Sequence, residues 1–552
     1  MNIKRLFLTV GLAIVSVMLW SQWQHYNATV VSKPTATQTS RSNGAFVPPP
    51  AQAVSRSASI PSTQPTTASS QRSITVATDV LKVRVNLLGG NIDQASLPQY
   101  PVSLQDKDKP MTILSPTPGK YYVLSSGWTD SLQTKPLLYQ AQSSHYRLKS
   151  GEKELVVVLV AKKAGMQITK TLHFYRGQYH VRQDIVVKNT SKSSISGSFY
   201  HQISRQEPDR HFASMAYNGG AVSTTSVPYQ KVKYKDMQKA NLQLTSRGGW
   251  VAMQQHYFLS AWLPNQHKTH YFYSGVNNHS DLNNTVYNLG FTSALIHLKP
   301  GQSESNMTVF YVGPEKMKAL AALAPALDLT VDYGILSPIS MAIFWCMKEI
   351  HHFVGNWGWS IILVTLLIKL LLYWPSAMSY RSMARMKNMA PRVKSLQERF
   401  KDDKQALSKA TMELYRNEKV NPMGGCLPML VQIPIFIALY WVLIESVELR
   451  QSPFIFWIHD LSVKDPFYIL PILMGGSMFL QQKLSPAPAD PAMAKTQLIM
   501  PIVFTVFFMH FPAGLVLYWL TNNLVSVAQQ AYILKTYDSK ADDIKRRKKK
   551  KR

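Results

Sequence analysis

Residues 360–374 form the stretch that most limits what this chain can fold into. The stretch is almost entirely apolar and is long enough to anchor a membrane span. Lys369 interrupts it, and a lysine in the middle of a membrane helix costs roughly 2.5–3.5 kcal/mol. For this span alone, two explanations are open. Either the lysine stem reaches the interface near Pro375, about 9 Å along the helix, or the ammonium group faces a water-filled cavity.

The other apolar runs are unevenly placed along the 552 residues. They gather at residues 6–20 and again after Ile339, and the region between them has the composition of a soluble domain. We therefore expect a polytopic α-helical membrane protein with one large extramembrane domain. The net charge of +30 favours a phosphate-rich partner, either anionic lipid or RNA. The two cysteines, Cys346 and Cys426, lie outside the soluble region, so that domain has no disulfide.

The N-terminal apolar run has two interpretations. It is short enough for a cleaved signal peptide, but no small-residue cleavage site follows it directly. Trp20, Trp23 and Tyr26 resemble the aromatic belt of a membrane interface. We favour an uncleaved anchor over residues 1–26 with a cytoplasmic N-terminus. Residues 27–72 are rich in Ser, Thr, Pro and Gln and are predicted to be a disordered tether.

Residues 73–330 have the pattern of an all-β domain. Residues 74–87 alternate for much of their length and end at the turn Gly89-Gly90. Further strands are expected at 155–161, 167–175 and 180–188, and many short strands in one domain indicate a large sandwich. The histidines are scattered and form no metal-binding motif; they include His173, His180 and His201.

Residues 337–353 are predicted to form an amphipathic helix that lies in the interface on the outer side of the membrane. Ser337 would be its N-cap, with Pro338 in the first turn. The apolar face would contain Ile339, Ala342, Ile343, Cys346, Ile350 and Phe353. The alternative is the start of a long tilted span, but the polar run at 348–352 argues against it.

The remaining chain alternates between apolar spans and polar connections. We expect span two at 355–378, a basic helical hairpin at 379–423, span three at 424–449, an outer loop at 450–466, span four at 467–484, a cytoplasmic loop at 485–497, spans five and six at 498–534, and a basic tail at 535–552. Eleven Lys or Arg between 379 and 422, and eight consecutive bases at the end of the tail, place both segments in the cytoplasm. The resulting topology has six spans, both termini inside and the β domain outside.

Several of the predicted spans carry one polar group at a similar, inner-leaflet depth. A shared hydrated groove, open to the cytoplasm, explains all of these groups, whereas snorkelling explains only one of them. The predicted groove residues are Lys369, Thr365, Gln432, Thr505 and Asn523. An apolar slide at the lipid edge would be formed by Ile433, Pro434, Phe436, Phe507, Phe508, Tyr518 and Trp519.

These features indicate a protein that moves polypeptide into the lipid bilayer. They give no indication of a covalent reaction. The sequence has no Walker pattern, no GxSxG and no HExxH motif, so we expect no enzyme, no cofactor and no metal. Two alternatives are a solute transporter that uses Lys369 and a carbohydrate-binding domain on a membrane anchor. The chain shows no internal repeat of the kind common in transporters, and the second alternative rests on fold analogy alone.

Six motifs resemble the bacterial YidC family of membrane protein insertases, which is related to the mitochondrial and chloroplast insertases. They are NWGWS (356–360), NPMGGCLP (421–428), QIPIF (432–436), WIHDL (457–461), DPFYILP (465–471) and FPAGLVLY (511–518). The start of the β domain also resembles the Gram-negative form. The resemblance implies a periplasmic β-supersandwich, a five-span insertase core in the inner membrane, and a groove that receives nascent membrane proteins alone or beside the Sec translocon.

The resemblance also implies that the basic hairpin and tail contact ribosomes and targeting factors. Arg392, Lys394 and Arg399 are the hairpin candidates, and anionic lipid is the alternative partner. Two positions depart from the usual Gram-negative pattern. Lys369 stands where the groove cation is typically arginine, so the planar fork for carboxylates is lost. Trp519 stands where a second tyrosine is usual, so one hydroxyl is absent.

Overall fold

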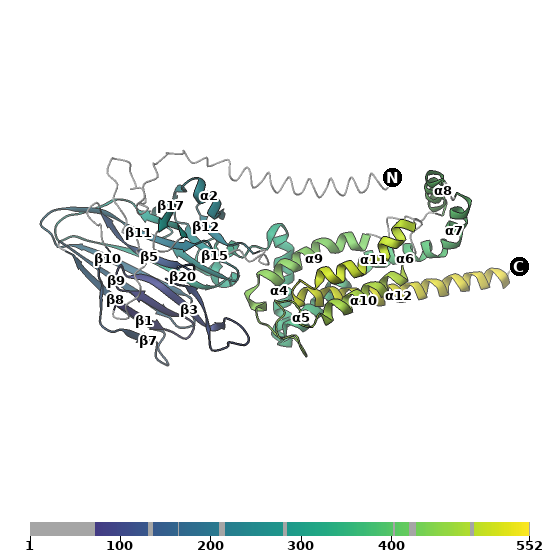
Figure 1. Cartoon of the computed structure of the whole chain (residues 1–552), viewed down its shortest axis with the longest axis horizontal. Helices are drawn as coiled ribbons and strands as arrows, with labels where there is room; N and C mark the ends of the chain where they lie inside the picture. Colours follow the sequence, from purple (N-terminus) through teal and green to yellow (C-terminus); the bar gives the residue numbers. More distant parts are fainter. Residues whose placement is uncertain are drawn as a thin grey trace. The chain divides into compact units, whose positions relative to one another are not determined.

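The computed structural model describes residues 72–130, 136–163, 165–208, 216–279, 284–400, 403–418, 427–485 and 491–550. The chain divides into two compact units, Met1–Val331 and Asp332–Arg552 (Figure 1). The expected anchor at 1–26, the tether up to residue 71, the first residues of span three, part of the 485–497 loop and the last two residues of the tail lie outside the described residues.

The first unit is built from two β-sheets, and in both of them some neighbouring strands are far apart in the sequence. The larger sheet has 11 strands, and its main path runs through β14 (Gln243–Arg247), β17 (Thr269–His279), β18 (Asn284–Ser293), β11 (Ile195–Gln206), β5 (Tyr122–Asp130), β3 (Asn91–Pro101), β2 (Lys82–Asn86), β1 (Ser73–Ala77) and β7 (His145–Arg147). Off this path, β19 (Ile296–Leu298) pairs with β11 and β4 (Pro110–Leu114) pairs with β3.

The second sheet has nine strands. Its order is β13 (Gln230–Val232), β12 (Gly219–Ser223), β15 (Trp250–Gln255), β16 (Phe258–Leu263), β20 (Ser303–Pro314), β10 (His180–Asn189), β9 (Met166–Tyr175), β8 (Glu154–Lys163) and β6 (Gln140–Ala141). Two short α-helices, α2 (Tyr234–Lys239) and α3 (Met317–Leu323), and the 3-10 helix η3 (Leu327–Thr330) complete the described part of this unit.

Alternation along the strands builds the core of this unit. In β9 every second side chain is buried, which gives the sheet one inner and one outer face. The core is rich in aromatic side chains, and Trp128, Trp250 and Trp262 are almost completely buried. The expected single strand at 74–87 is wrong, because Thr78 turns the chain: its Oγ1 accepts from the Leu81 amide at 3.0 Å. The stretch therefore folds as the antiparallel pair β1 and β2.

The second unit is helical. Its helices are α4 (Ser337–Val354), α5 (Trp357–Leu371), α6 (Tyr373–Asn388), α7 (Ala390–Arg399), α8 (Lys404–Asn417), α9 (Leu427–Glu445), α10 (Ile469–Leu484), α11 (Pro491–Phe508) and α12 (Ala513–Lys550), with 3-10 turns η4 (Gly334–Leu336) and η6 (Val447–Leu449). In Figure 1, α5, α10 and α12 run side by side, and α12 packs against both of the others.

Local sequence explains where α5 begins and ends. Asn356 caps it, since its side chain accepts from the amides of Gly358 and Trp359. The ring of Pro375 would clash with the carbonyl of Leu371 in a continuous helix. The helix therefore ends at Leu371, before the expected boundary at 378, and α6 continues at an angle of 69° to α5.

Among the helices of the described segments, no single helix is both long enough and apolar enough to cross a membrane. The bent pair of α5 and α6 reaches that length and apolarity when the two helices are taken together. Gln432–Glu445 in α9 and Gln497–Phe508 in α11 are shorter apolar helical segments. The count of six spans therefore stays a prediction.

The helix α4 differs from its prediction in two respects. Ser337 lies inside the helix rather than capping it, and Leu336 occupies the cap position without a side-chain hydrogen bond. The buried side chains are Ser340, Ile343 and Met347, because this face packs against α5 and α9. The Ser340 hydroxyl donates to the Ala438 carbonyl of α9 at 3.0 Å. Phe353, which was expected on the same face as Ile343, is 86% exposed.

Prolines and a buried aspartate shape the chain around the last helices. Pro512 lies in the break between α11 and α12, which covers residues 509–512. Asp465 holds the start of α10, because its carboxylate accepts from the Leu470 amide at 2.7 Å and from the Trp457 indole at 3.0 Å. The loop before α10 is thereby fixed to the helical unit.

Candidate functional site

One face of α12 carries a row of buried polar side chains. Asn522, Ser526 and Gln530 follow each other at intervals of four residues, so they lie one above the other on the helix. All three are buried, together with the neighbouring Asn523. The amide oxygens of Asn522 and Gln530 have no hydrogen-bond partner among the described residues. Buried acceptors of this kind normally bind water or a ligand.

Lys369 of α5 meets this row. Its Nζ donates to Ser526 Oγ at 2.8 Å, and the side chain is only 7% exposed. The Ser526 hydroxyl in turn donates to the Asn522 carbonyl at 2.7 Å. Within the described part of the chain, no carboxylate pairs with Lys369. The ammonium group is therefore held in the interior by a neutral acceptor alone.

The row also joins α12 to α10. Asn523 Nδ2 donates to Ser477 Oγ at 3.2 Å, and Gln530 Nε2 approaches Ser485 Oγ at 3.4 Å. Lys369 and Asn523, both predicted groove residues, thus contact hydroxyls of one continuous interface of α5, α12 and α10. Thr365, one turn before Lys369, is buried, and its hydroxyl donates to the Ile361 carbonyl of its own helix at 2.6 Å.

Thr505 and Gln432 contact other parts of the helical unit. Thr505 donates to the Pro501 carbonyl at 2.7 Å and packs against Gly475 of α10, where a side chain would overlap its hydroxyl. Gln432 of α9 hydrogen-bonds the Tyr518 hydroxyl of α12. The structure therefore places Thr505 at the α10–α11 interface and Gln432 at the α9–α12 interface, and no direct hydrogen bond joins either residue to Lys369.

A further polar contact compensates for a proline. Pro501 lacks an amide hydrogen, so the Gln497 carbonyl four residues earlier has no helical donor. The side chain of Gln482 in α10 donates to this carbonyl. Gln482 Oε1 remains without a partner among the described residues.

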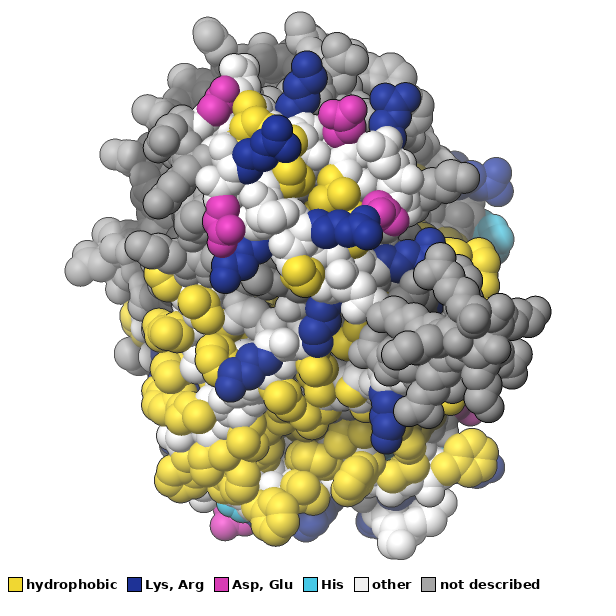
Figure 2. Space-filling view, turned by 90° about the vertical axis from the view of Figure 1, so that its right-hand side faces the viewer, with side chains coloured by type: hydrophobic (Ala, Val, Ile, Leu, Met, Phe, Trp, Pro, Cys, Tyr) yellow, Lys and Arg dark blue, Asp and Glu magenta, His cyan; other side chains and the backbone are white. Residues whose placement is uncertain are grey.

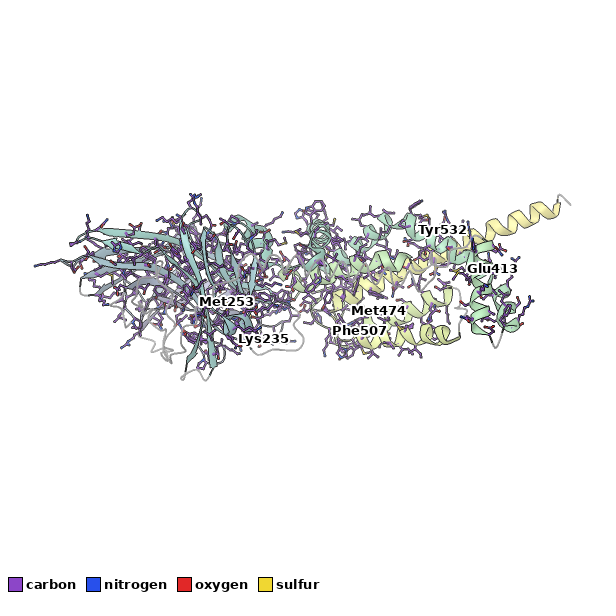
Figure 3. All side chains as sticks on the ribbon, turned by 90° about the horizontal axis from the view of Figure 1, so that it is seen from above. Lys235, Met253, Glu413, Met474, Phe507 and Tyr532 are labelled. Atoms are coloured by element: carbon purple, nitrogen blue, oxygen red, sulfur yellow. The ribbon has the colours of Figure 1, made fainter. Side chains whose placement is uncertain are left out.

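The aromatic members of the predicted slide form a cluster between α9, α11 and α12. Phe436 lies edge-on to Trp519 at 4.7 Å between ring centroids, and Phe508 lies 5.2 Å from Trp519. Phe508 and Tyr518 are buried inside the cluster, so they supply packing rather than exposed surface. Exposed apolar surface comes from Ile433 and Phe507, whose exposed fractions are 44% and 54%. Figure 3 shows Phe507 of α11 and Met474 of α10 on neighbouring helices.

The basic hairpin is formed by α7 and α8. Arg392 makes an exposed ion pair with Glu418 at 2.5 Å, and Arg399 lies over the Phe400 ring. Lys394 is exposed, whereas Val393 between these bases is buried. Figure 2 shows Lys and Arg side chains dispersed over the end of the molecule that carries this hairpin.

Ser526, Gln530 and Ser477 are site residues that the sequence reasoning missed. A signal for two of them was present, since Asn522, Ser526 and Gln530 repeat at the spacing of one helix face. Serine is small and common in membrane helices, so it does not stand out as an isolated polar residue does. Ser477 follows two glycines and was covered by the apolar pattern of its helix.

Two histidines of the β unit, His173 and His201, make polar or packing contacts within it. His173 pairs with Glu154 at 2.6 Å on the outer face, and the buried His201 stacks on Phe291. Among the residues that the structure describes, no three His, Cys, Asp or Glu side chains come together as a metal site.

Sequence comparisons decide the family. A family described as "60Kd inner membrane protein" matches residues 349–540, and the family "YidC periplasmic domain" matches residues 73–346. The chain is 47% identical to "Membrane protein insertase YidC" of Coxiella burnetii (strain RSA 331 / Henzerling II), with 100% of both chains covered. It is 44% identical to the protein of the same name from Legionella pneumophila (strain Paris), over 97% of this chain and 98% of the relative.

The chain belongs to the YidC family of membrane protein insertases. The resemblance drawn from the motifs is thus confirmed over the full length. A solved structure described as "Active YidC insertase crystal structure with the first transmembrane domain resolved" is also similar, with 17% identity, a TM-score of 0.39, and coverage of 84% of this chain and 92% of that chain. The YidC family consists of inner membrane proteins with a periplasmic domain, and it is not a family of enzymes.

Proposed function

We propose that this chain inserts segments of nascent membrane proteins into the inner membrane through a hydrophilic groove around Lys369. The observation that carries the proposal is the Lys369 ammonium group, which is buried among helices and bonded to the neutral Ser526. Burying a cation without a carboxylate partner costs free energy of folding. Ionisable residues of this kind inside membrane proteins are usually functional. The ammonium group attracts acidic or polar segments of an entering chain.

The groove would consist of Lys369, Thr365, Gln432, Thr505 and Asn523, to which the polar face of α12 adds Ser526 and Gln530. The unpaired amide oxygens on α12 support hydration of this region, because water satisfies such groups. Hydration would shorten the apolar distance that a polar segment must cross. The exposed Ile433 and Phe507 would then guide the apolar part of the segment at the lipid edge.

The remaining parts of the proposal concern topology and partners. Both termini and the α7–α8 hairpin would lie in the cytoplasm, and the β unit would lie in the periplasm. The hairpin bases Arg392, Lys394 and Arg399, with the basic tail, would contact ribosomes and targeting factors, and they would also attract anionic lipid. The chain would work alone or beside the Sec translocon.

Reconstitution tests the central step. The purified chain is placed in liposomes as the sole protein, and a short phage-coat-like protein is added during its synthesis. Protease protection of the substrate then measures insertion. Empty liposomes and liposomes with Lys369→Glu are the controls. We expect protection with the unaltered chain, and equal protection in empty liposomes would overturn the proposal.

A further inference from the structure

Three helices of the second unit meet at Ser526. Lys369 of α5 donates to its hydroxyl oxygen at 2.8 Å, and the hydroxyl hydrogen is directed to the Asn522 carbonyl of α12 at 2.7 Å. The Tyr380 hydroxyl of α6 also faces this serine. Ser526 is only 3% exposed. Because the Ser526 hydroxyl accepts from Lys369 and donates to the Asn522 carbonyl, its orientation is fixed.

This fixed orientation determines where the charge of Lys369 lies. A lysine ammonium group is a compact charge on a flexible four-carbon stem, and it lacks the planar fork with which arginine orients itself. Four freely rotating bonds would spread the charge over several positions, and ordering such a side chain costs entropy. The bond to Ser526 restricts the ammonium group before a substrate arrives. Preorganisation of this kind increases affinity because the ordering cost is already met.

The same geometry leaves the ammonium group available. Lysine has three N–H donors, and Ser526 takes one of them. In the described segments, no carboxylate competes for the other two. A carboxylate of an entering segment would therefore find a charged donor that is both held in place and unpaired. Charge-assisted hydrogen bonds are about twice as strong as neutral ones.

We propose that Ser526 is a positioning residue, which holds the Lys369 ammonium group and thereby sets the preference of the groove for acidic over neutral substrate segments. This inference rests on the proposed insertase function. Ser526 is then a specificity determinant on α12, and the preference for acidic segments depends on where the lysine charge lies and not on its presence alone. The Ser526 hydroxyl is the active feature, so threonine at this position preserves the effect and alanine removes it.

The test uses two substrates that differ in charge only. Both are the same short single-span protein, with two aspartates before the span in one and two asparagines in the other. Full-length chain in liposomes inserts each substrate, and the measured quantity is the acidic-to-neutral insertion ratio. The variants are Ser526→Ala, Ser526→Thr and Lys369→Ala. Ser340→Ala is the matched control, because Ser340 is a similarly buried serine whose hydroxyl donates to the Ala438 carbonyl at the contact of α4 with α9.

We expect Ser526→Ala to lower the ratio by about threefold to tenfold, as loss of one hydrogen bond of ordinary net strength would. Insertion of the acidic substrate should fall more than that of the neutral substrate, and Ser526→Thr and Ser340→Ala should keep the original ratio. An unchanged ratio in Ser526→Ala overturns the inference. If both substrates lose insertion by the same factor, the ratio is also unchanged, and Ser526 has a structural role only. If the unaltered chain inserts both substrates without preference, the inference fails while the insertase function stands. If it inserts neither, the proposed function itself fails.

Discussion

Lys170, in the middle of β9, donates across the β-sandwich to the main-chain carbonyl of Ser126 in β5 at 2.6 Å. Its Nζ also donates to the carbonyls of Gly89 and Gly90 at 3.2 and 3.0 Å, and it lies 5.0 Å from the Tyr139 ring centroid. The side chain is completely buried. One ammonium group thus ties the turn between β2 and β3 to the opposite sheet, with no carboxylate bonded to it among the described residues.

This arrangement predicts a pH dependence of the stability of the β unit. Burial lowers the pKa of Lys170 from 10.5 to about 7. Above pH 7 the folded state releases the proton while the unfolded state keeps it up to about pH 10.5, so the free energy of unfolding rises with pH across this window. Below pH 7 both states keep this proton, so Lys170 contributes no slope there. Burial raises the pKa of Tyr139 and lowers that of His201, so their contributions fall near pH 10 and below about pH 6.5, where the unfolded phenol and imidazole titrate, outside the range from pH 7 to pH 9.

Hydrogen exchange of the full-length chain in detergent measures this effect. Protection of the amides near Gly90, corrected for the intrinsic pH dependence of exchange, should increase from pH 7 to pH 9. Lys170→Met should flatten the dependence. Lys162→Met is the matched control, because Lys162 is exposed on the neighbouring strand β8. A slope that survives in Lys170→Met would assign the titration to another group.

A second prediction concerns the sign of the groove charge. Lys369→Arg should support insertion, whereas Lys369→Glu should abolish it, because a carboxylate at this position repels acidic segments. Complementation of a strain depleted of its own insertase measures both variants. Lys369→Ala should retain part of the activity, since Thr365 and the polar face of α12 remain. Equal growth with Lys369→Glu at normal protein levels would show that the charge is dispensable.

A third prediction uses two adjacent glycines of α10. A Cβ at Gly475 would overlap the Thr505 hydroxyl of α11, whereas a Cβ at Gly476 meets no atom within 4 Å. Gly475→Ala should therefore separate α10 from α11 and destabilise the helical unit by about 1–3 kcal/mol, the usual cost of overpacking. Gly476→Ala should be neutral or slightly stabilising, since alanine favours the helix. Thermal unfolding in detergent measures the difference, and equal melting temperatures would contradict this packing.

Much of the local structure could be predicted from the sequence, because strand alternation and proline breaks act over a few residues. The pattern at 167–175 gave β9 almost unchanged, and Pro512 marks the break before α12. The buried face of α4 could not be predicted, since it depends on contacts with α9 rather than on the helix's own pattern. The Lys369–Ser526 pair joins residues 157 apart, and no local rule selects such a partner.

The corrected face of α4 gives a fourth prediction. Ile343 is 7% exposed and packs inside the helical unit, whereas Phe353 is 86% exposed. Ile343→Asp should destabilise the unit by about 3 kcal/mol, because it buries an unpaired carboxylate. Phe353→Asp should change the unfolding free energy by less than about 0.5 kcal/mol, as is usual for surface substitutions. Thermal unfolding in detergent measures both variants. If both lose a similar amount of unfolding free energy, Ile343 and Phe353 are packed alike and the structure of α4 described above is contradicted.

The last prediction concerns the basic hairpin and tail, which we propose to lie in the cytoplasm. The α7–α8 hairpin and the eight bases of the tail are expected to bind translating ribosomes through phosphates. Salt weakens contacts with lipid as well as with RNA, so salt dependence alone does not distinguish the two partners. Neutral detergent removes the lipid surface and leaves the ribosome. Co-sedimentation in detergent should therefore fall when the chain ends at Asp543, and it should fall further when Arg392, Lys394 and Arg399 are all replaced by Glu.

Two comparisons separate the contributions of hairpin and tail. The exposed Lys233 and Lys235 of the β unit, replaced by Glu, change the net charge of the chain without touching the hairpin, so this variant should sediment normally. If the shortened chain sediments as well as the full chain at low salt, the tail makes no ribosome contact. If the hairpin substitutions also leave binding intact, the basic residues act only through topology and anionic lipid, which vesicle binding of the same variants would then measure.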